Sequence, residues 1–342
     1  MKRIINYPLG KTPQEFELIN VTKNVFWMRM PLPFSLNHIN IWLIEEIDSW
    51  TIIDSGLNLE SNQDYWQQVI TTKFKNKPIK QIVCTHMHPD HIGLSGWLCE
   101  KYGAELRMSK GEYDGCKAIM STAEQIDYAF EYEFYHNNGA DNDQVKLYDN
   151  YIGMYRKYVY PISSKNKTLV AGELLTLGEY EWCVVIGSGH SPEHVCLWCE
   201  ELNIFISGDQ ILPTISSNIS VHPSEPNANP LENWLNSCKY LKELLNDTVL
   251  VLPSHGKPFI EVEKRLGEQI VEIENDLQKL AVFCKKPKKV THGFEVLFRS
   301  NITNHNFMMA CGESRAHYNY LTQKNILQTY VDNDNVNWYI AC

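Results

Sequence analysis

The chain has 342 residues, which is enough for about two domains. Hydrophobic residues make up 44% and charged residues 21%, a balance that excludes wholesale disorder. The net charge of −10 disfavours nucleic acid and anionic membranes, because both repel an acidic protein. No apolar run approaches the roughly 18 residues that a membrane span needs, and the basic start MKR has no apolar segment behind it. We therefore expect a cytoplasmic protein with no membrane partner.

The first third alternates β-rich runs with amphipathic helical runs. The predicted elements are a hairpin of residues 41–44 and 50–53, a helix over 62–70, a strand over 79–85 and a helix over 94–102 that ends at Gly103. This alternation favours an α/β protein whose sheets are covered by helices.

Residues 111–160 differ in composition, since they hold nine of the 18 tyrosines. Apolar residues recur at steps of three and four from 119 to 134 and again from 148 to 158, around a polar turn at 137–143. The pattern predicts a helical hairpin inserted into the main domain. Packing against the body of the domain and covering a substrate pocket are both open, and one does not exclude the other.

The rest of the chain returns to strands before a change in charge. We predict strands over 174–207, a helix from Asn229-Pro230 through 245, a buried strand over 249–253 and a long helix over 260–283. Residues 285–342 carry seven basic and four acidic residues, so the sign reverses there.

We predict a catalytic domain of residues 1–284, with the insertion at about 111–160, and a C-terminal module of residues 285–342. Short helices over 295–298 and 314–324 precede a two-stranded hairpin, 327–331 with 337–341, which indicates a winged-helix-like module. We expect this module to serve packing or a homodimer rather than the reading of DNA.

The densest chemical signal is the run Cys84-Thr85-His86-Met87-His88-Pro89-Asp90-His91, which directly follows a β-rich segment. A loop leaving a strand can direct His86, His88, Asp90 and His91 toward one point, whereas a helix cannot. Imidazoles and a carboxylate at this density suit zinc or another borderline first-row metal. Four such groups can serve adjacent centres, which favours two metal ions over one.

Three further candidates each follow an apolar run and lie beside a glycine: His190, Asp209 and His255. Each alone is an ordinary loop histidine or turn aspartate. Their shared position past the end of a buried strand predicts that they converge with the first group.

This order, His-x-His-x-Asp-His and then Gly-His, Gly-Asp and His-Gly, resembles the metallo-β-lactamase-fold hydrolases over about residues 25–285. The resemblance implies a four-layer αβ/βα sandwich with a dinuclear site at one edge. It implies that His86, His88 and His190 bind one metal, that Asp90, His91 and His255 bind the second, and that Asp209 bridges them. Zn²⁺ is expected first, although the same ligands accept iron or manganese.

The implied catalyst is a hydroxide that bridges the two metals, formed from water near neutral pH and oriented by Asp90. Groups behind the ligands fix the imidazole tautomers. Asp54, after the buried run 50–53, is the best candidate for this role, and His194 is either a second such group or an ordinary strand residue. His38 and His222 are weaker candidates that would line the substrate pocket.

The substrate class stays open between two hypotheses. Asp209 stands where metallo-β-lactamases usually carry Cys or Ser, which disfavours β-lactams, and together with His91 it resembles the glyoxalase II branch. The tail resembles members with a winged-helix module, some of which cut single-stranded RNA. We favour a small-molecule thioester, ester or lactone, which suits the acidic chain and the aromatic insertion. The alternative is an endoribonuclease, suggested by the basic tail and by tyrosines available for base stacking.

Overall fold

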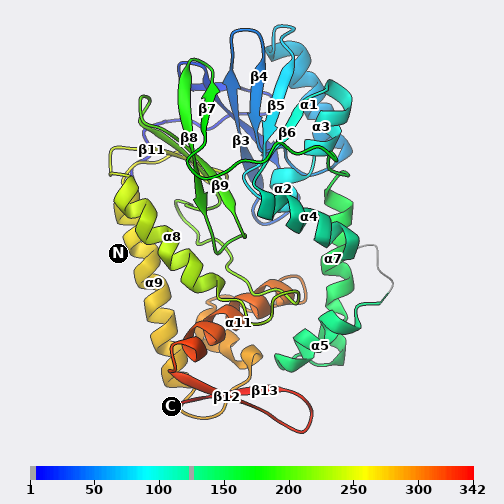
Figure 1. Ribbon diagram of the computed structural model, residues 1–342, viewed down its shortest axis with the longest axis vertical. Helices are drawn as coiled ribbons and strands as arrows, with labels where there is room; N and C mark the ends of the chain where they lie inside the picture. The colour runs from blue at the N-terminus through cyan, green and yellow to red at the C-terminus, as the bar shows by residue number, and fades with distance from the viewer. Residues whose placement is uncertain (1–4, 123–126) are drawn as a thin grey trace.

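The computed structural model describes residues 5–122 and 127–342 and contains two stacked sheets with helices outside them (Figure 1). The first sheet is antiparallel from β1 to β4 and parallel from β4 to β6. Its strands, in spatial order, are β1 (Ile19–Thr22), β2 (Val25–Pro31), β3 (His38–Glu45), β4 (Trp50–Ile53), β5 (Ile79–Val83) and β6 (Glu105–Arg107).

The second sheet is antiparallel except where β10 pairs with β11 in parallel. Its strands, in spatial order, are β11 (Leu250–Pro253), β10 (Ile204–Gly208), β9 (His194–Cys199), β8 (Tyr180–Gly187) and β7 (Leu174–Leu177).

Three separate hydrophobic clusters show the layering. Between the sheets, Trp27 and Trp42 of the first pack with Trp182 of the second. A second cluster lies between the first sheet and α1 (Glu60–Lys73) and α3 (Ser95–Tyr102), and a third lies outside the second sheet. Helix, sheet, sheet and helix therefore follow one another, which confirms the predicted αβ/βα sandwich. Helix α3 ends where predicted, because Gly103 adopts a left-handed φ of 71°.

The inserted segment is more divided than the hairpin that its periodicity predicts. It contains α4 (Lys110–Thr122), α5 (Ala129–Asn137), α6 (Asn142–Val145) and α7 (Leu147–Tyr158). The apolar stripe from 119 to 134 crosses residues 123–126, which lie outside the described residues. At the turn, the Asp141 side chain accepts hydrogen bonds from the backbone of α6 and fixes its start.

Two long helices lie outside the second sheet and continue toward the C-terminal elements (Figure 1). They are α8 (Pro230–Leu244) and α9 (Val262–Phe283). Helix α8 begins as its Asn-Pro start predicts, since the Asn229 side chain accepts a hydrogen bond from the backbone N–H of Glu232. Among the described residues, no helix is both long and apolar enough to cross a membrane.

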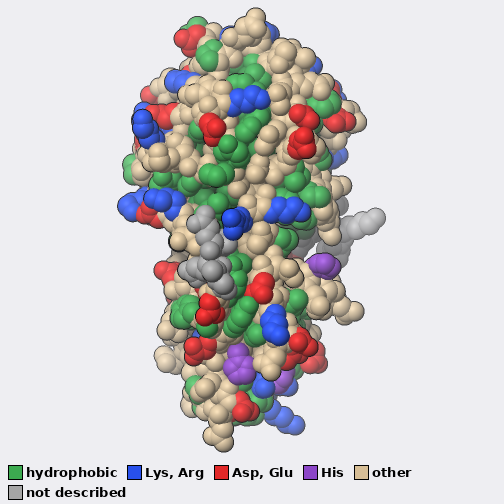
Figure 2. Space-filling view, turned by 90° about the vertical axis from the view of Figure 1, so that its right-hand side faces the viewer, with side chains coloured by type: hydrophobic (Ala, Val, Ile, Leu, Met, Phe, Trp, Pro, Cys, Tyr) green, Lys and Arg blue, Asp and Glu red, His purple; other side chains and the backbone are tan. Residues whose placement is uncertain are grey.

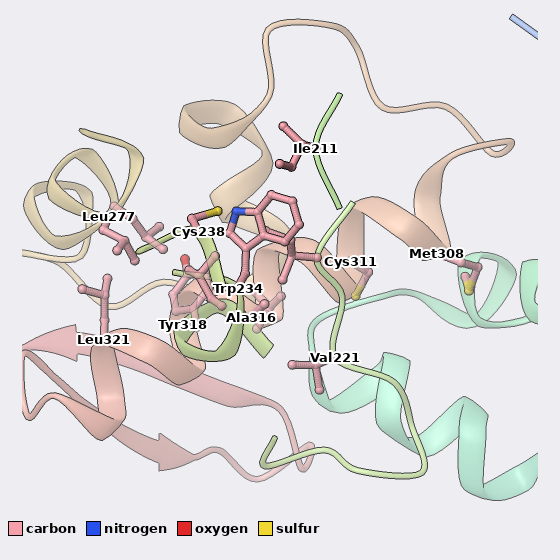
Figure 3. Close-up of a cluster of buried hydrophobic side chains, with 14 of the residues drawn as sticks. Ile211, Val221, Trp234, Cys238, Leu277, Met308, Cys311, Ala316, Tyr318 and Leu321 are labelled. Atoms are coloured by element: carbon pink, nitrogen blue, oxygen red, sulfur yellow. The ribbon is translucent and has the colours of Figure 1, made fainter. Parts of the chain in front are cut away.

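The C-terminal segment shares a core with the helices before it. It contains the 3₁₀ turn η1 (Val290–Gly293), α10 (Phe294–Leu297), α11 (Phe307–Gln323), β12 (Leu327–Val331) and β13 (Asn337–Ala341). Helix α11 begins at Phe307 rather than at the predicted Ser314. Figure 3 shows Trp234 and Cys238 of α8 beside Cys311 and Tyr318 of α11. The domain boundary at residue 284 and the winged-helix character of the module stay predictions.

Candidate metal centre

The seven predicted ligands come together from four strand ends. Short α2 (Pro89–Ile92) and the loop before it, which together follow β5, carry four of them, and the loops after β8, β10 and β11 carry one each. The loop after β5 of the first sheet and the loop after β10 of the second meet, because the ligand atoms of His86, His91 and Asp209 lie within 4.8 Å of one another.

The first group consists of three ring nitrogens that face one another. His86 Nε2 lies 2.9 Å from His88 Nδ1 and 3.2 Å from His190 Nε2. Burial holds the pKa of His86 and His88 well below its ordinary range, and neighbouring histidines lower it further. The rings are therefore neutral at physiological pH, and their lone pairs are free for a cation.

The second group is more acidic. Asp90 Oδ2 lies 3.3 Å from His255 Nε2 and 3.6 Å from His91 Nε2. Burial by itself would raise the pKa of Asp90, but the charges of His91 and His255 lower it to about 2. Burial opposes a charge on His255, yet the carboxylates of Asp209 and Asp90 raise its pKa to about 10. The ligands of the first group are therefore uncharged, whereas those of the second group, which lies beside it, carry charge.

Asp209 lies between the two groups. Its Oδ2 is 3.6 Å from His190 Nε2 and 3.5 Å from His91 Nε2, and its Oδ1 is 3.5 Å from His255 Nε2. One carboxylate thus lies close to histidines of both groups.

A hydrogen-bond relay behind the cluster fixes two tautomers. The Thr85 hydroxyl donates to Asp54 Oδ2 at 2.9 Å, so its oxygen accepts the Nδ1 proton of His86, 3.0 Å away. His91 Nδ1 donates directly to Asp54 Oδ2 at 2.8 Å. Both rings therefore direct Nε2 toward the centre, and the orienting role of Asp54 stays a prediction.

Backbone carbonyls fix two more tautomers. His190 Nδ1 donates to the carbonyl of Asn218 at 2.7 Å, and His255 Nδ1 donates to the carbonyl of His38 at 2.8 Å. Both rings again direct Nε2 toward the cluster. Four of the five histidines in the cluster thus have Nδ1 engaged in a hydrogen bond and Nε2 turned toward the other ligands.

The donor set fits a divalent metal ion. His91 Nε2 and Asp209 Oδ1 are buried without a hydrogen-bond partner in the described chain, and such orphaned atoms are costly unless something binds them. Five imidazoles and two carboxylates suit zinc, iron or manganese.

The remaining predicted residues lie around the cluster. His194 is the buried first residue of β9, and its Nε2 accepts the backbone N–H of Asp209 at 3.1 Å, so it supports the ligand loop. His38 Nε2 accepts the N–H of Gly256 at 3.1 Å, which ties its ring to the loop of His255. His222 lies in the loop after Asp209, where burial and then the charge of His190 lower its pKa. A pocket-lining role for His38 and His222 stays a prediction.

Sequence reasoning did not identify Thr85 or Asn218 as parts of the site. Thr85 stood inside the ligand run, where a hydroxyl beside His86 was a usable signal. Asn218 contributes its backbone carbonyl to His190, and a carbonyl carries no side-chain signature.

Comparisons with known proteins agree with this geometry. The family model "Metallo-beta-lactamase superfamily" matches residues 35–255, and the model "Metallo-beta-lactamase-like, C-terminal domain" matches residues 277–342. The probable metallo-hydrolase YqjP of Bacillus subtilis (strain 168) is 24% identical, over 92% of this chain and 97% of that protein. The human acyl-coenzyme A thioesterase MBLAC2 is 23% identical, over 77% of this chain and 89% of its own length.

A solved structure extends the likeness over nearly the whole chain. The beta-lactamase domain protein of Burkholderia ambifaria superposes with a TM-score of 0.90 at 34% identity and covers 99% of this chain and 98% of that one. The chain therefore belongs to the metallo-beta-lactamase superfamily and is a metal-dependent hydrolase.

Proposed function

We propose that the protein hydrolyses acyl thioesters at a dinuclear centre, with Zn²⁺ as the first candidate for both metals. His86, His88 and His190 would hold one ion, and Asp90, His91 and His255 the other. The observation that carries the dinuclear assignment is Asp209, which lies within 3.6 Å of histidines in both groups. When bound, such ions supply an ionised water and polarise a carbonyl oxygen.

The chain's own residues orient that chemistry. Asp90 is ionised at neutral pH because its pKa lies at about 2, so its carboxylate can accept a hydrogen bond from the attacking water. Hydrolysis forms a carbon–oxygen bond and breaks the carbon–sulfur bond. The products are a carboxylic acid and a thiol, and Asp90 would relay to the thiol the proton that the attacking water loses.

The thioester class rests on two supports. The human relative is named as an acyl-coenzyme A thioesterase, and the inserted segment supplies many aromatic side chains. Esters and lactones share the carbonyl chemistry and stay within the proposal. The glyoxalase II branch, suggested by Asp209 with His91, is consistent with a thioester substrate.

On the face that Figure 2 draws, the charges of the described residues add no support for an RNA substrate. Figure 2 shows basic and acidic side chains next to one another on the face that it draws. We therefore include single-stranded RNA in the test below, where its cleavage would support the endoribonuclease hypothesis.

The test is a substrate panel with metal-replete protein. It contains an acyl-coenzyme A thioester, a lactone, a β-lactam and single-stranded RNA. We expect thioester turnover that a chelator abolishes and that Asp90→Asn lowers by about 10²- to 10⁴-fold. Asp64→Asn, an exposed change on α1, is the matched control and should leave turnover unchanged.

Elemental analysis addresses the number of metals. Wild-type protein should retain two ions per chain, and His255→Ala should retain one. Cleavage of RNA alone, lost in Asp90→Asn, would replace the thioester assignment with the endoribonuclease one.

A further inference from the structure

The peptide between two predicted ligands is held by the inserted segment. Met87 lies between His86 and His88. Its backbone N–H donates to Glu112 Oε2 at 2.9 Å, and its carbonyl accepts the Tyr155 hydroxyl at 2.7 Å. Glu112 belongs to α4 and Tyr155 to α7, and both side chains are buried. Two helices of the insertion therefore fix both hydrogen-bonding groups of one residue.

The same carboxylate reaches a second ligand loop. Glu112 Oε1 accepts the backbone N–H of Glu193 at 2.8 Å, and Glu193 follows closely after His190 in the chain. One buried side chain thus spans the loop of His86 and His88 and the loop of His190. These are the three residues of the first group.

The contacts around Glu112 keep α4 close to both loops. A Cβ added to Gly115 would lie 2.6 Å from Met87 Sδ, so the helix approaches the ligand loop as closely as a glycine permits. In return, Glu193 Oε2 accepts the N–H of Gly111 at 2.6 Å, and the Ser109 hydroxyl donates to the Glu193 carbonyl at 2.8 Å. The start of α4 and the loop after His190 therefore hold each other.

Burying a carboxylate here is costly, and it needs compensating hydrogen bonds. Burial raises the pKa of Glu112 to about 7, although the N–H groups of Glu193 and Met87 counteract the rise. An apolar residue would pack α4 without this cost. What it could not do is accept an N–H from each of two loops at once.

We propose that Glu112 is a positioning residue of the metal centre, whose carboxylate sets the separation of the loop of His86 and His88 from the loop of His190. Tyr155 holds the same Met87 peptide through its carbonyl. This inference rests on the proposed role of these histidines as metal ligands. It gives the insertion a task apart from any contact with substrate.

The test measures metal binding separately from turnover. Glu112→Gln keeps the shape but places an amide N–H₂ opposite one of the two N–H donors. We expect metal affinity, measured by competition with a chromophoric chelator, to fall by about 10- to 100-fold, as for other groups that orient ligands. Tyr155→Phe removes only one hydroxyl and should cause a smaller loss. With a thioester substrate, kcat should fall while KM stays the same.

The matched control is Asp114→Asn, an exposed carboxylate on the same helix whose partner is Lys110. It should bind metal as wild type does. The visible spectrum of the cobalt-substituted protein should change in Glu112→Gln and not in the control, because that spectrum reports ligand geometry.

Wild-type metal affinity and an unchanged cobalt spectrum in folded Glu112→Gln would overturn the proposal. If Glu112→Gln does not fold, Tyr155→Phe decides in the same way, and wild-type affinity there would overturn it too. Neither readout needs a known substrate, so failure of the thioester assignment can be told apart from failure of this inference.

Discussion

Asp54 is buried behind the metal centre, and Asn has nearly the same shape, so Asp54→Asn changes hydrogen-bonding chemistry with little change in packing. In the wild type, Asp54 Oδ1 accepts the Thr85 N–H at 2.8 Å, and Oδ2 accepts from the Thr85 hydroxyl at 2.9 Å and from His91 Nδ1 at 2.8 Å. In the variant, one oxygen can keep the Thr85 N–H, but the amide nitrogen must then face His91.

An amide N–H₂ only donates, so His91 Nδ1 would have to accept and its proton would move to Nε2. That atom faces Asp90 and Asp209, at 3.6 and 3.5 Å, where the metal is proposed to bind. Loss of such an orienting partner typically weakens metal affinity by about 10- to 100-fold. This corresponds to about 1.4–2.8 kcal/mol of binding free energy.

The assay compares Asp54→Asn with Asp54→Ala by chelator competition and by urea unfolding of the metal-free proteins. Asn should lose more metal affinity, because it imposes the wrong tautomer. Ala should lose more stability, because it leaves the buried Thr85 N–H without an acceptor. If the two variants bind metal equally well, or if Asp54→Asn matches wild type, the tautomer of His91 is not what Asp54 controls.

Three further outcomes are expected. The folded state holds a proton on Glu112 up to about pH 7, whereas an unfolded chain loses it near 4.5. The unfolding free energy of metal-free wild type, relative to that of Glu112→Gln, should therefore be greatest below pH 4.5 and fall by roughly 3 kcal/mol as pH rises through 7. A difference in urea unfolding that does not change with pH would contradict this. Ending the chain after Cys284 would expose Trp234 and should give aggregated or non-cooperative protein, whereas a cooperative thermal transition would show an independent catalytic domain. Asn229→Ala should lower the unfolding free energy by about 1 kcal/mol in urea, and no change would mean that this cap contributes nothing.

The cluster could be predicted from the sequence because its signals are local. His86, His88, Asp90 and His91 follow one buried strand, and glycine neighbours mark His190, Asp209 and His255. Loops at the same edge of the sandwich lie close together, so the place of each residue directly after a buried strand was enough to predict the cluster. Asp54 could be found for the same reason, since it directly follows β4, which pairs with β5.

Other features left no periodic signal. Helix α11 is buried over most of its surface, against α8, α9 and η1 among others. An amphipathic stripe marks a helix with one solvent face, so the first turns of α11 were missed. Glu112 was missed for another reason. On a helix, an isolated glutamate predicts an exposed side chain, and only tertiary structure shows this one turned inward against two loops.

The segments added to the sandwich also explain why the ligand loops keep one geometry. The insertion holds Met87 through Glu112 and Tyr155. The C-terminal module contacts the loop that supports His190. The Asn218 carbonyl accepts a hydrogen bond from His190 Nδ1, and the Asn218 side-chain N–H donates to Glu313 of α11 at 2.6 Å. Without a bound cation, the ligand side chains do not hold their own loops together. The loops therefore need fixed hydrogen-bond partners to stay aligned. In this chain Glu112, Tyr155 and Glu313 supply some of those partners from outside the two sheets, so changes in the insertion or in α11 should alter metal binding while the sandwich itself stays folded.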